Sequence, residues 1–233
     1  MCIRNRWLSV IWKVVTVVVG TFGLLGGSGV LAGAYSPSFP HMFTNLSNMA
    51  VCLYFLVAAV AVLAGRDAAR PVLPQVKYTL TMSILTTMLI AHFMLFDTLM
   101  DSSGRIIPHM LCLHYIVPIM TVADWLLFDE KGRMRAWGPL VWPAFLLGYA
   151  AFTLVYVGVF GGYMGGGTTA DITRYPYTFL DPAFLSWMGV AGFCGVVTIV
   201  VVALGYVLFG LDRLLARFGA KTAGDAARPK HMR

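Results

Sequence analysis

The sequence has few charged residues and few cysteines, and these two shortages exclude several classes of protein. Charged side chains make up 12% of its 233 residues, about half the share found in soluble domains, so a water-soluble globular protein is excluded. Four cysteines in a chain of this length do not make a disulfide scaffold. The chain also has no Cys-x-x-Cys and no His-Glu-x-x-His, so neither a metal site nor any other cofactor is expected.

Hydrophobic residues make up 59% of the chain, and its mean hydropathy is +0.78. They form six continuous runs, each near the roughly 20 residues that a helix needs to cross a bilayer. The runs do not alternate with period two, which is the pattern of a β-barrel. The sequence therefore predicts an all-α membrane protein, a single domain of six transmembrane helices followed by a basic tail at 214–233. The expected spans are 8–34, 45–64, 78–100, 109–128, 140–160 and 184–208.

The positive charges predict the orientation of these helices. Fifteen of the 17 lysines and arginines fall in the two termini and in the second and fourth connections, and only Arg105 and Arg174 fall on the other side. Cytoplasmic segments carry the excess of lysine and arginine, so both termini should be cytoplasmic, in a bacterial inner membrane. The net charge of +7 then belongs to membrane anchoring, and no nucleic acid partner is expected. The external connections should be 35–44, 101–108 and 161–183, the last long enough to cap a cavity.

Two features predict how the helices pack. Asp124 lies near the cytoplasmic end of the fourth run and should form an ion pair with Lys13 or Lys77. The first run has glycines that permit close helix contacts: Gly20, Gly23, Gly26, Gly27, Gly29 and Gly33.

Polar residues inside apolar spans are costly and mark the places where chemistry is expected. Thr44, Ser47 and Asn48 have the spacing i, i+3, i+4, which puts them on one helical face. His114 should lie about 8 Å below the outer end of its helix. The candidate site residues in the outer half are Thr44, Ser47, Asn48, His92, Asp97 and His114.

Pro118 lies four residues after His114. A proline within a helix has no N–H to donate to the carbonyl four residues earlier, and its ring crowds that carbonyl. The helix should therefore be disturbed here and leave a polar backbone acceptor beside the imidazole.

Several short motifs resemble a prokaryotic family of six-helix membrane proteins. They are Phe43–Asn48, His114–Pro118, Asp124–Phe128 and Tyr175–Asp181. The same segments are similar to the androgen-induced and androgen-dependent membrane proteins of animals. Those are membrane-embedded hydrolases that cleave fatty acid esters of hydroxy fatty acids with one threonine and one histidine.

The resemblance implies a hydrolase of fatty acyl esters in which Thr44 is the nucleophile and His114 the base, with a lipidic ester as its partner. A threonine hydroxyl needs a nearby base to accept its proton, and a neutral imidazole suits that role near pH 7. Ser47 or Asn48 are candidate donors to the anionic oxygen of the tetrahedral intermediate. His92 or Asp97 are candidates to orient the imidazole.

Two other functions fit the same polar residues. His92 and His114, at similar depth on consecutive helices, are possible axial ligands of a b-type haem in an electron-transfer protein. A polar outer cavity would also suit a small-molecule transporter, although the chain lacks the repeated broken helices of many transporter folds.

Overall fold

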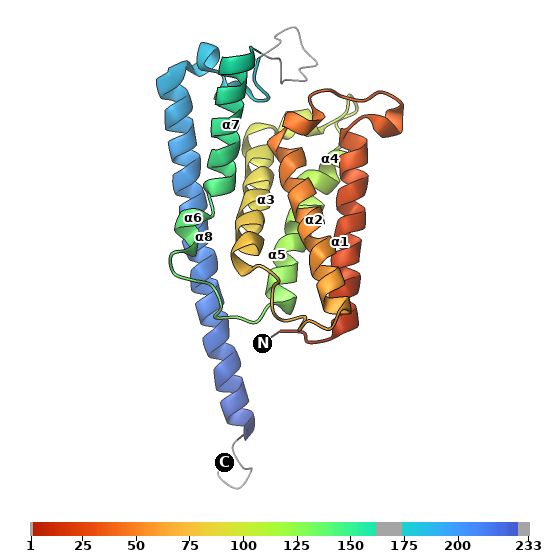
Figure 1. The fold of residues 1–233 in the computed structure, drawn as a ribbon, viewed down its shortest axis with the longest axis vertical. Helices are drawn as coiled ribbons and strands as arrows, with labels where there is room; N and C mark the ends of the chain where they lie inside the picture. Colours follow the sequence, from red (N-terminus) through yellow and green to blue (C-terminus); the bar gives the residue numbers. More distant parts are fainter. Residues whose placement is uncertain (1, 162–173, 228–233) are drawn as a thin grey trace.

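The helices of the chain run side by side in an elongated bundle (Figure 1). The computed structural model describes residues 2–161 and 174–227, with side chains up to residue 218, and this part contains helices and no β-strand. The all-α fold predicted from the sequence is therefore confirmed. The α-helices are α1 (Arg6–Gly27), α2 (Phe43–Leu63), α3 (Pro74–Met94), α4 (Pro108–Leu111), α5 (Val117–Phe128), α6 (Gly138–Val141), α7 (Ala144–Phe160) and α8 (Pro182–Ala227).

Five helical segments are long and apolar enough to cross a membrane. They are Arg6–Gly27, Phe43–Leu63, Pro108–Phe128, Gly138–Phe160 and Pro182–Phe218. The sixth long helix, α3, contains Lys77 and several threonines. It contacts α2, α5, α7 and α8, and its buried polar side chains, such as Lys77, Thr81 and Thr86, face other helices rather than lipid. The large apolar side chains exposed on the other helices, such as Leu53 and Ile199, suit a membrane environment.

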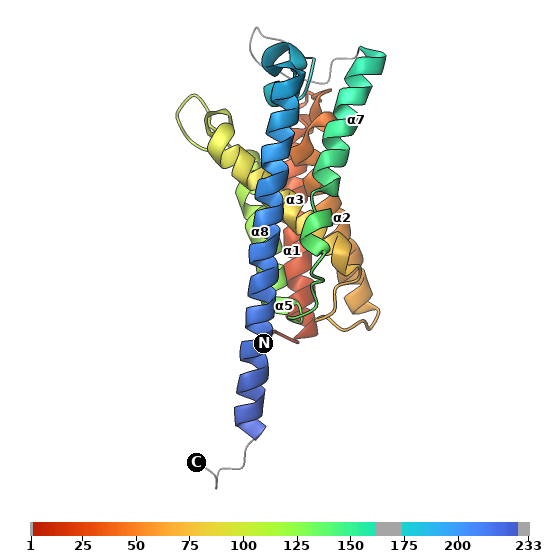
Figure 2. The same ribbon diagram turned by 90° about the vertical axis from the view of Figure 1, so that its left-hand side faces the viewer.

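The central position of α3 divides the bundle. In Figure 1, α1, α2 and α5 lie on one side of α3, and α7 and α8 lie on the other. The N-terminus and the C-terminal end of α8 lie at the same end of the bundle (Figure 1). Figure 2 shows that α8 extends beyond the other helices at this end.

Two helix ends differ from the predicted spans. The first helix stops at Gly27 rather than at Ala34, because the chain turns sharply at Gly29. Gly29 has φ +77°, and a side chain there would place its Cβ 1.9 Å from the carbonyl oxygen of Ala34. The last helix continues past 208 to Ala227, since no proline interrupts it, so much of the predicted basic tail is helical.

Three further spans have shifted ends or interruptions. The third helix begins at Pro74, a residue well suited to a first helical turn, and ends at Met94, before a short 3₁₀ turn over Phe96–Leu99. The fourth is continuous from Pro108 to Phe128 but contains a π-helical turn over Cys112–Ile116. The fifth is divided between α6 and α7 at Trp142 and Pro143.

The glycines of α1 allow close packing, as the sequence predicts. A Cβ at Gly20 would lie 2.3 Å from Sγ of Cys52 on α2, and one at Gly23 would lie 2.7 Å from a methyl carbon of Leu113. Because no side chain larger than hydrogen fits there, these glycines bring α1 against both α2 and the π-helical turn.

Candidate functional site

Thr44 and His114 are in direct contact. The Oγ1 of Thr44 lies 3.3 Å from Nε2 of His114. Thr44 is half-buried in the first turn of α2, and His114 is buried in the π-helical turn. Residues that are 70 positions apart in the chain are therefore brought together at one point of the bundle.

The local backbone explains the position of His114. Pro118 has no N–H, so the carbonyl of His114 has no α-helical donor. The backbone widens at the preceding residues, and the N–H of Val117 donates to the carbonyl of Cys112, the hydrogen bond of a π-helix. Single π-turns of this kind occur often at functional sites. The disturbance predicted from Pro118 is therefore present, and it takes the form of a π-turn.

The hydrogen bonds of His114 define which nitrogen can act as a base. Its Nδ1 lies 3.0 Å from the carbonyl oxygen of Met110. A carbonyl oxygen only accepts hydrogen bonds, so this contact requires the proton on Nδ1. Nε2 is then the unprotonated nitrogen, and it faces the hydroxyl of Thr44.

An apolar cavity opens on one side of the pair, between α2, α3, α7 and α8. Its walls include Ile90, Leu146 and Phe193, and Thr44 and His114 are among its few polar lining residues. The cavity contains about 570 Å³ of space, part of it open to the surroundings. It is narrow, since a water molecule can reach only about 40 Å³ of this space.

A more polar cavity lies on the other side of the pair, towards the connection between α1 and α2. Its lining includes Ser36, Ser38 and Thr98. The space in it that a water molecule can reach is about 220 Å³. The two cavities share a wall, because four residues line both of them: Thr44, Leu95, His114 and Tyr177.

Tyr177 lies beside Thr44, and reasoning from the sequence gave it no role in the site. The backbone N–H of Thr44 points to its phenolic oxygen at 3.4 Å. The ring stacks on Phe179, with centroids 4.8 Å apart. Burial raises the pKa of the Tyr177 phenol above its usual value, so the hydroxyl keeps its proton. The motif Tyr175–Asp181 was the only signal for this residue in the sequence. Residues 162–173 of the predicted external connection lie outside the described part of the chain.

Ser47 and Asn48 lie on the same face of α2 as Thr44, as their spacing predicts. The Ser47 hydroxyl donates a hydrogen bond to the Thr44 carbonyl at 3.0 Å and lies 3.1 Å from Oγ1 of Thr87. The amide of Asn48 donates to the carbonyls of Thr44 and Leu113. Both side chains therefore hold α2 against its neighbours, and the Asn48 amide hydrogens are directed at backbone carbonyls.

His92 and Asp97 lie near the C-terminal end of α3 and have other surroundings. Nδ1 of His92 lies 3.1 Å from the hydroxyl of Tyr115, and Asp97 belongs to the 3₁₀ turn after α3. Within the described residues, the group that orients His114 is the carbonyl of Met110. Both ring nitrogens of His114 contact protein groups in this arrangement.

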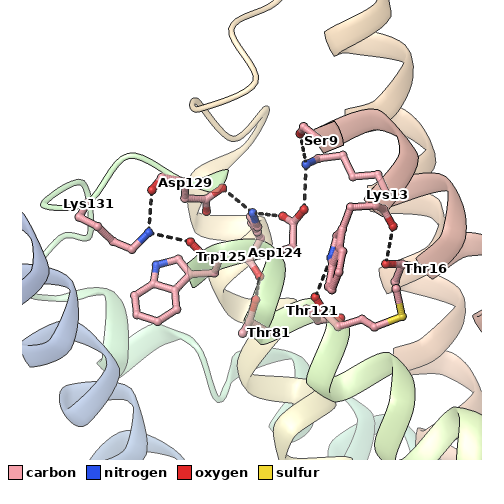
Figure 3. Close-up of polar contacts among 12 residues, drawn as sticks. Ser9, Lys13, Thr16, Thr81, Thr121, Asp124, Trp125, Asp129 and Lys131 are labelled. Carbon is pink, nitrogen blue, oxygen red and sulfur yellow. Dashed lines mark hydrogen bonds and ion pairs between the residues drawn. The ribbon is translucent and has the colours of Figure 1, made fainter. Parts of the chain in front are cut away.

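A second polar cluster, drawn in Figure 3, lies near the beginnings of α1 and α3 and the end of α5. Asp124 contacts Nζ of Lys13 at 2.8 Å and Nζ of Lys77 at 2.5 Å, and Lys77 also contacts Asp129 at 2.6 Å. These four side chains are almost fully buried. The predicted ion pair of Asp124 is therefore confirmed with both lysines, and it joins α1, α3 and α5.

No protein-family model, no curated protein and no solved structure matches this chain. Among the described residues, there is also no group of three or more histidine, cysteine, aspartate or glutamate side chains that could hold a metal ion.

Proposed function

We propose that this protein is a membrane-embedded hydrolase of fatty acyl esters, with Thr44 as the nucleophile and His114 as the general base. The observation that carries the proposal is the contact between Oγ1 of Thr44 and Nε2 of His114, at the wall between an apolar and a polar cavity. A nucleophile and its base within hydrogen-bond reach, with the base oriented by a third group, are the signature of covalent catalysis.

In the first half of the reaction, Oγ1 of Thr44 forms a bond to the ester carbonyl carbon and gives its proton to Nε2 of His114. The tetrahedral intermediate then loses the alkoxide, which takes the proton from His114 and leaves as an alcohol. Thr44 now carries the acyl group. The Met110 carbonyl accepts from Nδ1–H throughout, which holds the ring in place while it is charged.

In the second half, His114 takes a proton from water, and the resulting hydroxide oxygen bonds to the acyl carbon. The intermediate collapses, the ester bond to Thr44 breaks, and Oγ1 recovers the proton from His114. A free fatty acid and the original site remain. The developing negative oxygen needs hydrogen-bond donors, and the Thr44 N–H and the hydroxyl of Tyr177 beside it are candidates.

The two cavities suit the two chemical parts of such a substrate. The narrow apolar cavity is lined by side chains such as Ile90, Leu146 and Phe193, which favour an acyl chain over a polar group. The polar cavity offers hydroxyl groups and suits the alcohol part and the hydrolytic water. The ester bond would then lie between them, at Thr44.

The test is covalent labelling of the purified protein with a fluorophosphonate probe, together with hydrolysis of a long-chain p-nitrophenyl ester. The wild type should be labelled on the peptide that contains Thr44, and Thr44→Ala should lose both the label and the activity. Thr198→Ala is the control, because it removes a threonine hydroxyl from α8, outside the lining of both cavities. Labelling of Thr44→Ala at the wild-type level would refute the proposal.

A further inference from the structure

A third cavity lies at the end of the bundle that holds the N-terminus. It is formed by the connection between α2 and α3 and the connection between α5 and α6. The space in it that a water molecule can reach is about 500 Å³. It is unrelated to the cavities at Thr44. Half of its lining residues are arginines: Arg66, Arg70, Arg133 and Arg135.

The cavity has more positive than negative charge. Arg133 is paired with Glu130 at 2.7 Å, and Arg70 lies at the longer distances of 3.7 Å from Asp67 and 3.9 Å from Glu130. Arg66 and Arg135 make no ion pair with any described carboxylate. Arg66 donates to backbone carbonyls of the same connection, at 3.3 and 3.4 Å, and Arg135 lies over the ring of Trp137, 5.5 Å from its centroid. Two guanidinium groups therefore remain uncompensated at this cavity.

The N-terminus of α3 adds to this positive field. Pro74 and Gln75, in the first turn of α3, line the cavity, and no side chain caps this helix end. The free N–H groups and the helix dipole favour a negative group at such a position. Together with the arginine side chains, which bind phosphate with paired N–H donors, they make a site complementary to a phosphate.

The surface beside the cavity is apolar. Leu73 and Val76 flank its lining residues in sequence and are 56% and 43% exposed, and Trp137, which stacks with Arg135, is 45% exposed. Arginines next to exposed apolar and tryptophan side chains are typical of the boundary between headgroups and acyl chains. A free anion would use only the charged part of this surface, whereas a phospholipid would use both parts.

We propose that this cavity binds the headgroup phosphate of an anionic phospholipid from the adjacent leaflet, with its acyl chains against Leu73, Val76 and Trp137. Basic pockets between membrane helices on the cytoplasmic side are suited to such headgroups. The proposal does not depend on the activity proposed for Thr44.

The experiment is a titration of the purified protein in neutral detergent with phosphatidylglycerol, phosphatidylcholine of the same chains, or inorganic phosphate. Binding is followed by thermal stability and by lipid retention in native mass spectrometry. Phosphatidylglycerol should bind the wild type more tightly than phosphatidylcholine. The Arg66→Gln/Arg135→Gln variant should weaken it about 30-fold, as expected for two charges at the membrane surface.

The control is Arg4→Gln/Arg217→Gln, which makes the same change in net charge outside the cavity lining and should bind as the wild type does. Arg66→Lys/Arg135→Lys keeps the charge and should retain most of the preference. If the double glutamine variant does not fold, Arg135→Gln alone serves, since the Arg135 side chain makes no described hydrogen bond. Wild-type affinity in the glutamine variant, equal binding of phosphatidylcholine, or equal stabilisation by inorganic phosphate would each overturn the proposal.

Discussion

Thr44 and His114 place a threonine hydroxyl against a buried imidazole nitrogen, whereas the exposed His92 faces the phenol of Tyr115. If they act as a unit, Thr44→Ala and His114→Ala should each abolish ester cleavage, and the double variant should be little worse than either one, because losses from paired catalytic residues do not add. Thr44→Ser keeps the hydroxyl and should retain part of the activity. Turnover of a long-chain ester by the wild type and the four variants measures this. Additive losses would show that the two residues act separately.

A substitution at Tyr177 distinguishes a role of this residue in catalysis from a role in packing. Tyr177→Phe removes only the hydroxyl beside the Thr44 N–H and keeps the ring that stacks on Phe179. If this hydroxyl stabilises the developing oxyanion, kcat should fall by about 10²–10³, while the melting temperature and KM change little. Tyr206→Phe removes the same atom from α8, outside the lining of both cavities at Thr44, and should be neutral. An unchanged kcat in Tyr177→Phe would show that this hydroxyl does not stabilise the oxyanion.

At the scale of helices, the buried ion pairs of Asp124 join α1, α3 and α5. Asp124→Asn should reduce the free energy of unfolding by about 3–5 kcal/mol, because it leaves buried positive charge without its partner. Lys13→Met/Asp124→Asn should be less damaging than Asp124→Asn alone, since Lys77 keeps Asp129. Reversible unfolding in mixed micelles gives the free energy of unfolding of the wild type and of both variants.

Asp67→Asn is the matched control for this prediction. Asp67 pairs with Arg70 at 3.7 Å, and both side chains are about half exposed, so the same substitution should cost about 0–1 kcal/mol. A loss for Asp124→Asn no larger than that for Asp67→Asn would show that the buried cluster does not stabilise the bundle.

At the scale of the whole molecule, the distribution of lysine and arginine predicts which end of the bundle is cytoplasmic. A cysteine placed at Ser103, in the exposed connection after α3, should react with an impermeant maleimide added to intact cells. A cysteine at Arg133, which is also exposed, should react only after the membrane is opened. Both cysteines are introduced into the Cys2→Ser variant, so that Cys2 itself does not react. Reaction of the Arg133 site in intact cells would reverse the orientation.

The sequence by itself determined the helical class and most of the helix positions, because a bilayer requires long apolar runs and fixes their length. It also predicted the ion pair of Asp124, since an acidic residue buried among apolar ones needs a nearby cation. The disturbance at Pro118 followed from the missing N–H. These results depend on local composition and on the backbone chemistry of single residues.

Only the tertiary structure decided which polar groups meet. The sequence put Thr44, His92, Asp97 and His114 in the same half of the membrane, but depth does not define which face of each helix points inward. The π-turn before Pro118 sets the direction of His114, and the chain that follows residue 173 brings Tyr177 to Thr44. The cavities on the two sides of the pair, and the arginine cavity at the other end, arise from contacts between segments far apart in the chain. Spacing along one helix carries no information about such contacts.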